Sequence, residues 1–193
     1  MKKAFCIILT IIVILVLLVL WNISPSSEGK QYYCNVKVIA LSTKIDISED
    51  SKVIRRVSGN ILKFLTDPLT LYEAKGNKIG YAGDSYRIIA QDAHGIYLDD
   101  KFKYDMDGKV DIFGETYNLY DTEGVQIGRL NFNFWDTKGT LYDMDDKVLA
   151  TYESSVLRQD YIVTISKACQ IEPDAILLLF ASYVSDKNAD SSN

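Results

Sequence analysis

The sequence AILLLFASYV at 175–184 decides the fold, because it is apolar on every side of a helix. It follows Glu172, Pro173 and Asp174. Proline is tolerated in the first helical turn, and acidic side chains are favourable near the positive end of the helix dipole. Because about 20 apolar residues are needed to cross a bilayer, this shorter segment predicts a helix buried inside a domain. We expect a sheet to wrap around this helix.

Three similar segments upstream of the helix predict β-hairpins. Each consists of Leu-Tyr-acid, a polar turn of constant length, and then Ile or Leu followed by a small residue. The segments are LYEAKGNKIG at 71–80, LYDTEGVQIG at 119–128 and LYDMDDKVLA at 141–150, with a weaker copy at 46–54. Gly or Asp in the turn tolerates positive φ, as hairpin turns require. Because the spacing between copies is irregular, we expect one sheet element to be reused, not a solenoid.

Alternating apolar and polar residues predict further strands. Leu130, Phe132 and Phe134 alternate with Asn131 and Asn133, which is a period of two. The same alternation occurs at 32–38, 101–106 and 161–165. Turns are expected at Gly76-Asn77, His94-Gly95, Asp107-Gly108, Glu123-Gly124 and Lys138-Gly139. Many short strands separated in this way predict a mainly β domain, either a barrel or a sandwich.

The N-terminal segment predicts one transmembrane helix. Lys2 and Lys3 precede AFCIILTIIVILVLLVLW at 4–21, which has no charged residue. Those residues would span about 27 Å as a helix, close to the bilayer core of about 30 Å. Trp21 stands where an interfacial aromatic residue is expected. We interpret residues 1–23 as a retained anchor or uncleaved signal.

The flanking charges give an orientation. Lys2 and Lys3 favour a cytoplasmic N-terminus and a single-pass protein of the cell membrane, with its domain extracytoplasmic. The alternatives are a signal cleaved near Ser24 or Ser26, or a domain that faces the cytoplasm. We assign residues 24–31 to a linker, 32–187 to the barrel domain and 188–193 to a tail.

The charge balance argues against nucleic acid as a partner. The chain has 21 basic and 26 acidic side chains, and without Lys2 and Lys3 the remainder carries 19 − 26 = −7. Nucleic-acid binding depends on basic side chains that neutralise phosphates, so none is expected here. The same charge weakens attraction to anionic lipids.

Cysteines and acidic residues supply only weak metal candidates. Cys34 and Cys169 could pair in an oxidising compartment or remain separate buried thiols, and no CxxC pair is available for zinc. The acidic candidates are Asp105, Asp107, Asp111 and Glu115 in one stretch and Asp143, Asp145 and Asp146 in another. In an EF-hand with Gly108 at its sixth position, Lys103 and Gly114 would have to be acids. We therefore expect acidic hairpin turns, with no metal or cofactor.

Catalytic candidates are equally sparse. His94 is the sole histidine and precedes Gly95, which predicts a solvated turn residue. Lys52, Arg55 and Arg56 form the densest basic cluster, which could hold a lipid head group or lie on a solvated strand. No serine stands in a nucleophile elbow, and no Gly-rich loop precedes a helix, so an enzyme is not expected.

The hairpins and the terminal helix together resemble the LURP-one-related family of the tubby C-terminal-like and phospholipid scramblase group. The matching stretches are YNLYDTEGVQIGRL (117–130), TLYDMDDKVLATYES (140–154), DYIVTISKA (160–168), PDAILLLFASYVSD (173–186) and, earlier, LYEAKGNKIG (71–80). The resemblance covers residues 32–187 and implies a closed barrel of about twelve antiparallel strands around a buried C-terminal helix. Tubby domains bind phosphoinositides and scramblases act with calcium, but this chain has no matching basic pocket or complete calcium motif. Its N-terminal anchor also departs from many members.

These observations favour a non-enzymatic, membrane-tethered binding or interaction module with a lipid or protein partner. The alternative is a phospholipid-binding or lipid-handling protein, which the resemblance suggests by analogy.

Overall fold

The computed structural model describes residues 28–39, 42–60, 68–84, 93–111, 114–155 and 158–190, which form twelve strands and one helix. The strands are β1 (Gly29–Ile39), β2 (Ser42–Glu49), β3 (Lys52–Asn60), β4 (Leu69–Glu73), β5 (Lys78–Asp84), β6 (Ala93–Leu98), β7 (Lys101–Asp111), β8 (Gly114–Tyr120), β9 (Gln126–Phe132), β10 (Lys138–Asp143), β11 (Val148–Ser155) and β12 (Arg158–Ser166). The helix is α2 (Pro173–Asp190).

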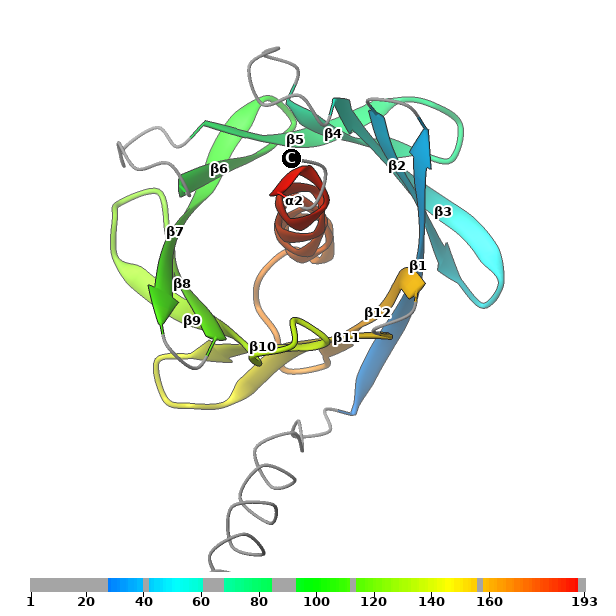
Figure 1. The fold of residues 1–193 in the computed structure, drawn as a ribbon. Helices are drawn as coiled ribbons and strands as arrows, with labels where there is room; N and C mark the ends of the chain where they lie inside the picture. Colours follow the sequence, from blue (N-terminus) through cyan, green and yellow to red (C-terminus); the bar gives the residue numbers. More distant parts are fainter. Residues whose placement is uncertain are drawn as a thin grey trace, which may run out of the picture.

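Each strand pairs antiparallel with its neighbours in the chain, and β1 pairs with β12 to close the barrel (Figure 1). The expected mainly β barrel of about twelve antiparallel strands around a C-terminal helix is therefore confirmed. β1 already begins at Gly29, inside the range assigned to the linker. The expected anchor at 1–23 lies outside the described residues. Among the described residues, no helix combines the length and the apolar character required to span a membrane.

The repeated segments form the hairpins β4–β5, β8–β9 and β10–β11, and the weaker copy forms β2–β3. In all three stronger copies, a β-bulge follows the buried leucine at Leu71, Leu119 or Leu141. The turn residue with positive φ occupies the same place in each copy. These residues are Gly76 (96°), Gly124 (83°) and Asp146 (64°). The shared Leu-Tyr-acid sequence therefore encodes one bulged hairpin, used three times.

Three predicted turns are wrong, because His94-Gly95, Asp107-Gly108 and Lys138-Gly139 lie in β6, β7 and β10. At Gly139 the reason is packing, because a Cβ there would lie 2.5 Å from the ring of Phe132. Gly139 therefore lets the Phe132 ring approach the barrel wall closely. From the sequence alone, a glycine with this role looks the same as a glycine in a turn.

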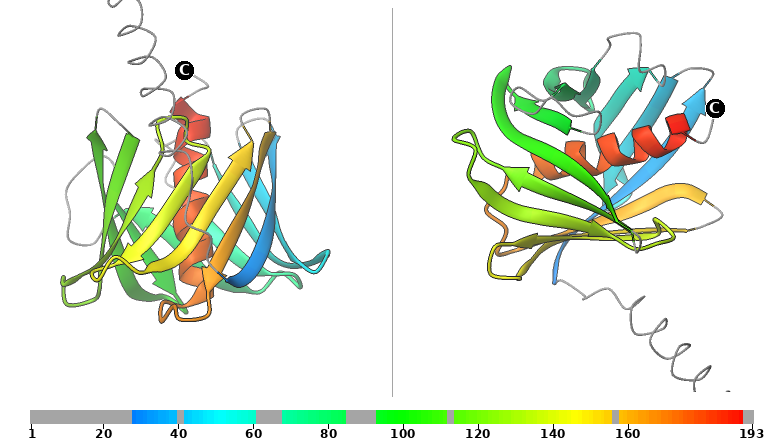
Figure 2. Two further views of the ribbon diagram at one scale, coloured as in Figure 1. Left: turned by 90° about the horizontal axis from the view of Figure 1, so that it is seen from below. Right: turned by 60° about the vertical axis from the view of Figure 1, so that its left-hand side comes forward.

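Helix α2 runs along the barrel axis (Figure 2). Every residue at 175–184 is buried, as the all-round apolar sequence predicts. The helix continues to Asp190, three residues into the segment assigned to the tail.

The helix lies off the centre of the barrel, nearest to β4, β5 and β6 (Figure 1). Aromatic side chains fill the wider space on the other side. Phe132 of β9 stacks on Tyr183 of α2 with ring centroids 3.5 Å apart, and Tyr152 of β11 stacks on Phe180 at 5.6 Å. Large rings therefore join the helix to the distant wall, because smaller side chains could not span the gap.

The barrel has two different ends. The hairpin end carries the turns at 50–51, 74–77, 99–100, 121–125 and 144–147, together with the first residues of β1 and α2. The exit end contains the end of α2 and the turn between β9 and β10. Because neighbouring strands are antiparallel, alternate connections lie at opposite ends. The chain therefore enters the barrel at the hairpin end.

Candidate functional site

One lysine near the end of α2 connects the helix to two parts of the exit end. The Lys187 Nζ donates to Glu115 Oε1 of β8 at 2.5 Å and lies 3.2 Å from Asp136 Oδ2 in the β9–β10 turn. The hydroxyl of Tyr117 donates to the other oxygen of Glu115 at 2.9 Å. A single helical cation thus bridges a strand and a turn that are distant in the sequence.

We call Lys187, Glu115 and Asp136 the junction, and its electrostatics favour the protonated form of Lys187. Burial alone would lower the pKa of Lys187, but the hydrogen bond to Glu115 and the charge of Asp136 outweigh it and raise that pKa. Burial and the nearby Asp136 carboxylate raise the pKa of the Tyr183 hydroxyl, so it stays neutral. The junction holds a protonated lysine between two carboxylates at neutral pH.

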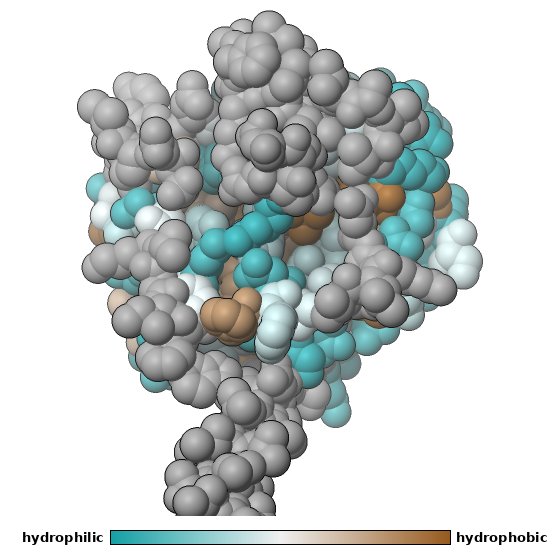
Figure 3. Space-filling model, viewed as in Figure 1, coloured by the Kyte–Doolittle hydropathy of each residue, from teal (hydrophilic) through white to brown (hydrophobic). Residues whose placement is uncertain are grey.

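The β9–β10 turn presents two aromatic rings to solvent. We call residues 133–138 the aromatic turn. Phe134 and Trp135 are each 65% exposed, and their rings meet edge to face with centroids 5.2 Å apart. Figure 3 views the molecule from the exit end, where the visible described residues are mostly hydrophilic and only small apolar areas lie between them. The two adjacent rings make this turn an exposed apolar feature of the described surface.

The aromatic turn is held firmly by its own hydrogen bonds. The side-chain oxygen of Asn133 accepts the amides of Thr137 and Lys138 at 2.9 and 3.0 Å. The amide of Asp136 donates to the Asn133 carbonyl at 2.9 Å, and Asp136 adopts φ 54°. Aspartate tolerates this conformation in turns, and the Asp136 carboxylate is bound by Lys187.

The position of His94 differs from the sequence prediction. His94 lies in β6, not in a solvated turn, and its Nε2 lies 2.7 Å from Asp186 Oδ2 of α2. Its side chain is 19% exposed. This contact joins β6 of the barrel wall to α2 and so helps to hold the helix in place.

The hairpin end holds the start of α2 in a similar way. Arg55 of β3 makes two hydrogen bonds to Asp174, at 2.8 and 3.2 Å, and this pairing raises the pKa of Arg55. On another side of the helix, Glu172 accepts from Lys103 at 2.8 Å and from Tyr104. Burial alone would raise the pKa of Glu172, but these two contacts outweigh it and lower that pKa. Both ends of α2 are therefore fixed to the wall by ionic contacts.

Two of the three residues of the predicted basic cluster are engaged in ion pairs. Arg55 binds Asp174, and Arg56 lies 3.3 Å from Asp46 on β2. Lys52 is exposed at the first position of β3. Two of the three candidate head-group cations therefore already have carboxylate partners.

The first acidic stretch is dispersed by the fold. Asp105 and Asp107 lie inside β7, and Asp105 is 1% exposed. Glu115 projects from β8 toward Lys187. Asp111 ends β7, and its side chain lies outside the described part of the structure. Among the described residues, no three His, Cys, Asp or Glu side chains are grouped so that they could hold a metal ion.

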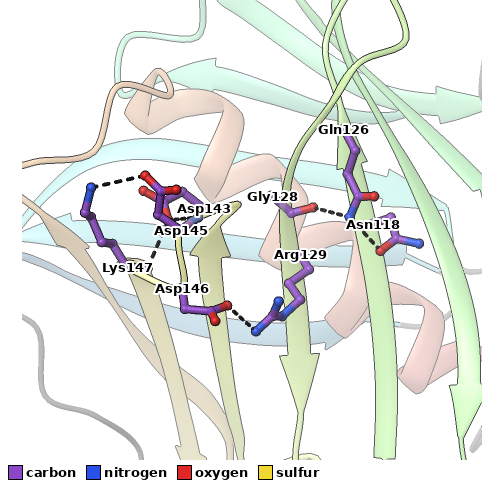
Figure 4. A network of polar contacts seen from close by, with 8 residues as sticks. All are labelled: Asn118, Gln126, Gly128, Arg129, Asp143, Asp145, Asp146 and Lys147. Atoms are coloured by element: carbon purple, nitrogen blue, oxygen red, sulfur yellow. Dashed lines mark hydrogen bonds and ion pairs between the residues drawn. The ribbon is translucent and has the colours of Figure 1, made fainter.

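The second acidic stretch is the β10–β11 turn, whose carboxylates are occupied (Figure 4). Asp143 accepts the amides of Asp145 and Lys147 at 2.9 Å each, which closes the turn. Asp146 accepts from Arg129 at 2.6 Å, and Asp145 lies 3.4 Å from the Lys147 Nζ. The predicted acidic hairpin turn is thus what this segment forms.

The two described cysteines are free thiols. Cys34 is buried in β1, and burial raises its pKa to about 12. Cys169 is half-buried just after β12. Each thiol behaves as a small apolar side chain.

The sequence patterns missed the aromatic turn. Alternation placed Phe134 in a strand with Leu130 and Phe132, but β9 ends at Phe132. The available signal was two adjacent aromatic residues followed by Asp136, a residue type that tolerates positive φ.

The chain was compared with protein-family models, with curated proteins and with solved structures, and none of them matches it.

Proposed function

We propose that the protein is a non-enzymatic binding module, tethered to the cell membrane by residues 1–23 and displayed on its extracytoplasmic side. The observation that carries the proposal is the exposed pair Phe134 and Trp135 on a firmly hydrogen-bonded turn. Exposing two such rings to water is unfavourable in free energy. Burying them against a binding partner removes this penalty.

The filled barrel supports a contact made from outside. The large side chains of α2 occupy the interior, and contacts at both ends hold the helix in place. A partner would therefore meet an outer wall or an end of the barrel. The aromatic turn at the exit end is the most apolar of the described turns.

We also propose that the chain belongs to the LURP-one-related family. The support is the twelve-stranded antiparallel barrel around a C-terminal helix, which is the architecture that the resemblance implies. A shared fold carries no activity with it, so the binding proposal rests on the aromatic turn alone.

A lipid-handling role through the basic cluster has less support. Arg55 and Arg56 would have to leave Asp174 and Asp46 to meet a phosphate. Removing a cation from Asp174 would also loosen the start of α2.

The tether is tested by extraction of cell membranes at alkaline pH. We expect the full chain to remain in the membrane pellet and a chain without residues 1–23 to leave it. Release of the full chain would contradict the tether. Surface labelling in intact cells tests the orientation.

A further inference from the structure

The amine of Lys187 contacts two carboxyl groups at once. Its Nζ donates to Glu115 Oε1 at 2.5 Å and lies 3.2 Å from Asp136 Oδ2, so the amine is held next to the carboxyl carbon of Asp136. By comparison, the exposed Lys147 amine lies 3.4 Å from Asp145 and contacts that one carboxylate in the described structure. Lys187 therefore has one carboxyl group that it could attack and a second one that could carry protons.

Aromatic rings shelter the junction from water. Tyr117 and Tyr183 are 8% and 2% exposed, and their rings meet edge to face with centroids 5.9 Å apart. The Lys187 Nζ lies 5.7 Å from the centroid of the Tyr183 ring, and the side chain of Glu115 is 17% exposed. Burial favours the neutral forms of an amine and a carboxyl group, so it eases proton transfer from the ammonium to Glu115. The ion pair is the resting form of the junction, and this transfer supplies the reactive amine.

From this geometry we infer that Lys187 and Asp136 become joined by an amide bond between Nζ and Cγ, with Glu115 as the proton carrier. The product would fasten the end of α2 covalently to the aromatic turn and would restrict the unfolded chain as a cross-link does. The inference does not depend on the proposed binding function, because both reacting groups lie within one chain.

The reaction needs no cofactor. Glu115 transfers two protons in turn from the Lys187 nitrogen to one carboxyl oxygen of Asp136. The amine attacks the carboxyl carbon, the new C–N bond forms, and the C–O bond to that oxygen breaks, so the oxygen leaves as water. One ammonium and one carboxylate thus become one amide and one water, with no oxidation or reduction, and Glu115 ends as the carboxylate that it was.

A tyrosine is placed to assist the attack. The charge of Asp136 acts on the buried hydroxyl of Tyr183, which shows that the two groups lie close together. That hydroxyl is neutral and can donate to the remaining carboxyl oxygen as this oxygen gains negative charge.

The test is mass spectrometry of the full chain, purified in detergent, incubated at neutral pH, denatured and digested with trypsin. Without the link, trypsin releases residues 130–138, which contain Asp136, and residues 168–187, which end at Lys187. The link should block cleavage after Lys187. We therefore expect one species in which 130–138 is joined to 168–193, lighter than the two peptides together by one water.

Two variants separate the chemistry from the fold. Glu115→Gln keeps the size of the side chain but cannot accept the proton, and it should slow the appearance of the linked peptide about 10²–10⁴-fold. Lys187→Arg keeps a cation between the two carboxylates but should give no linked peptide, because the guanidinium does not lose its proton. The matched control is Lys147→Arg, in the exposed pair with Asp145, which should form the link at the wild-type rate.

Separate peptides 130–138 and 168–187 from the wild type would overturn the inference, and this digest decides the point even if a variant does not fold. A linked peptide that forms equally fast in Glu115→Gln would also overturn it. Loss of water confined to peptide 130–138 would do the same, because it would indicate a succinimide at Asp136.

Discussion

Lys187 on the buried helix binds Asp136 in the aromatic turn, with Nζ and Oδ2 3.2 Å apart. The same amine donates to Glu115 of β8. The most exposed aromatic residues of the described chain are therefore connected, through one ionic contact, to the helix that fills the barrel. This contact ties the surface turn to the helix that fills the barrel.

Replacing Lys187 should loosen the aromatic turn. In Lys187→Met the carboxylates of Glu115 and Asp136 would face each other without a cation, at a cost of about 1–2 kcal/mol for a half-exposed junction. Amide hydrogen exchange at 133–138 should accelerate, while exchange at the 121–125 turn stays as in the wild type. Equal exchange at 133–138 in both proteins would show that the lysine does not hold the turn.

Phe132 should be among the most costly side chains to remove. Its ring is 5% exposed and stacks on Tyr183 at 3.5 Å, so Phe132→Ala leaves a cavity between the wall and the helix. We expect the free energy of unfolding to fall by about 3–5 kcal/mol in denaturant titration. Tyr33→Ala, at a position 49% exposed on β1, should stay within about 0.5 kcal/mol of the wild type. Similar losses in the two variants would argue against the packing described for α2.

Gly76 tests the shared hairpin geometry. Its φ is 96°, and no heavy atom lies within 4 Å of the position that a Cβ would take, so Gly76→Ala introduces backbone strain without a clash. A loss of about 1–2 kcal/mol in unfolding free energy is expected. Lys75→Ala, in the same exposed turn, is the control and should change stability little. A neutral Gly76→Ala would mean that the turn adopts another conformation.

The contact of Glu172 with Lys103 and Tyr104 predicts acid sensitivity. Its pKa is lowered in the folded protein relative to the ordinary 4.5, so its contribution to stability is present above that value and disappears as the pH falls through the folded pKa. Glu172→Gln should therefore lose less stability than the wild type between about pH 6 and about pH 3. Gln170→Ala, a nearby exposed change that removes no ionisable group, should keep the wild-type pH dependence. Identical slopes for Glu172→Gln and the wild type would refute the role of this contact.

The mainly β fold and its core helix were predictable from the sequence because both leave strong periodic signals, although periodicity alone left a barrel and a sandwich open. Residues 175–184 are apolar all round, and they are buried all round. The Leu-Tyr-acid copies marked three hairpins because bulge, turn and buried leucine recur together.

Local signals failed where a residue served a distant partner. Gly139 looked like a turn but leaves room for the ring of Phe132, and His94 looked solvated but faces Asp186 of the helix. The ion pair of Arg55 with Asp174 joins positions that only the closed barrel brings together. The aromatic turn was missed because alternation alone does not indicate where a strand ends.

The most direct test of the account is surface labelling of the aromatic turn in intact cells. Phe134→Cys is combined with Cys169→Ser in the full chain, so that the described part of the domain retains only the buried Cys34 besides the new thiol. We predict that a membrane-impermeant maleimide labels Phe134→Cys in intact cells, where Cys6 lies within the proposed tether, and that Cys169→Ser alone is not labelled there. Labelling of Phe134→Cys only after lysis would contradict an extracytoplasmic domain that displays its aromatic turn.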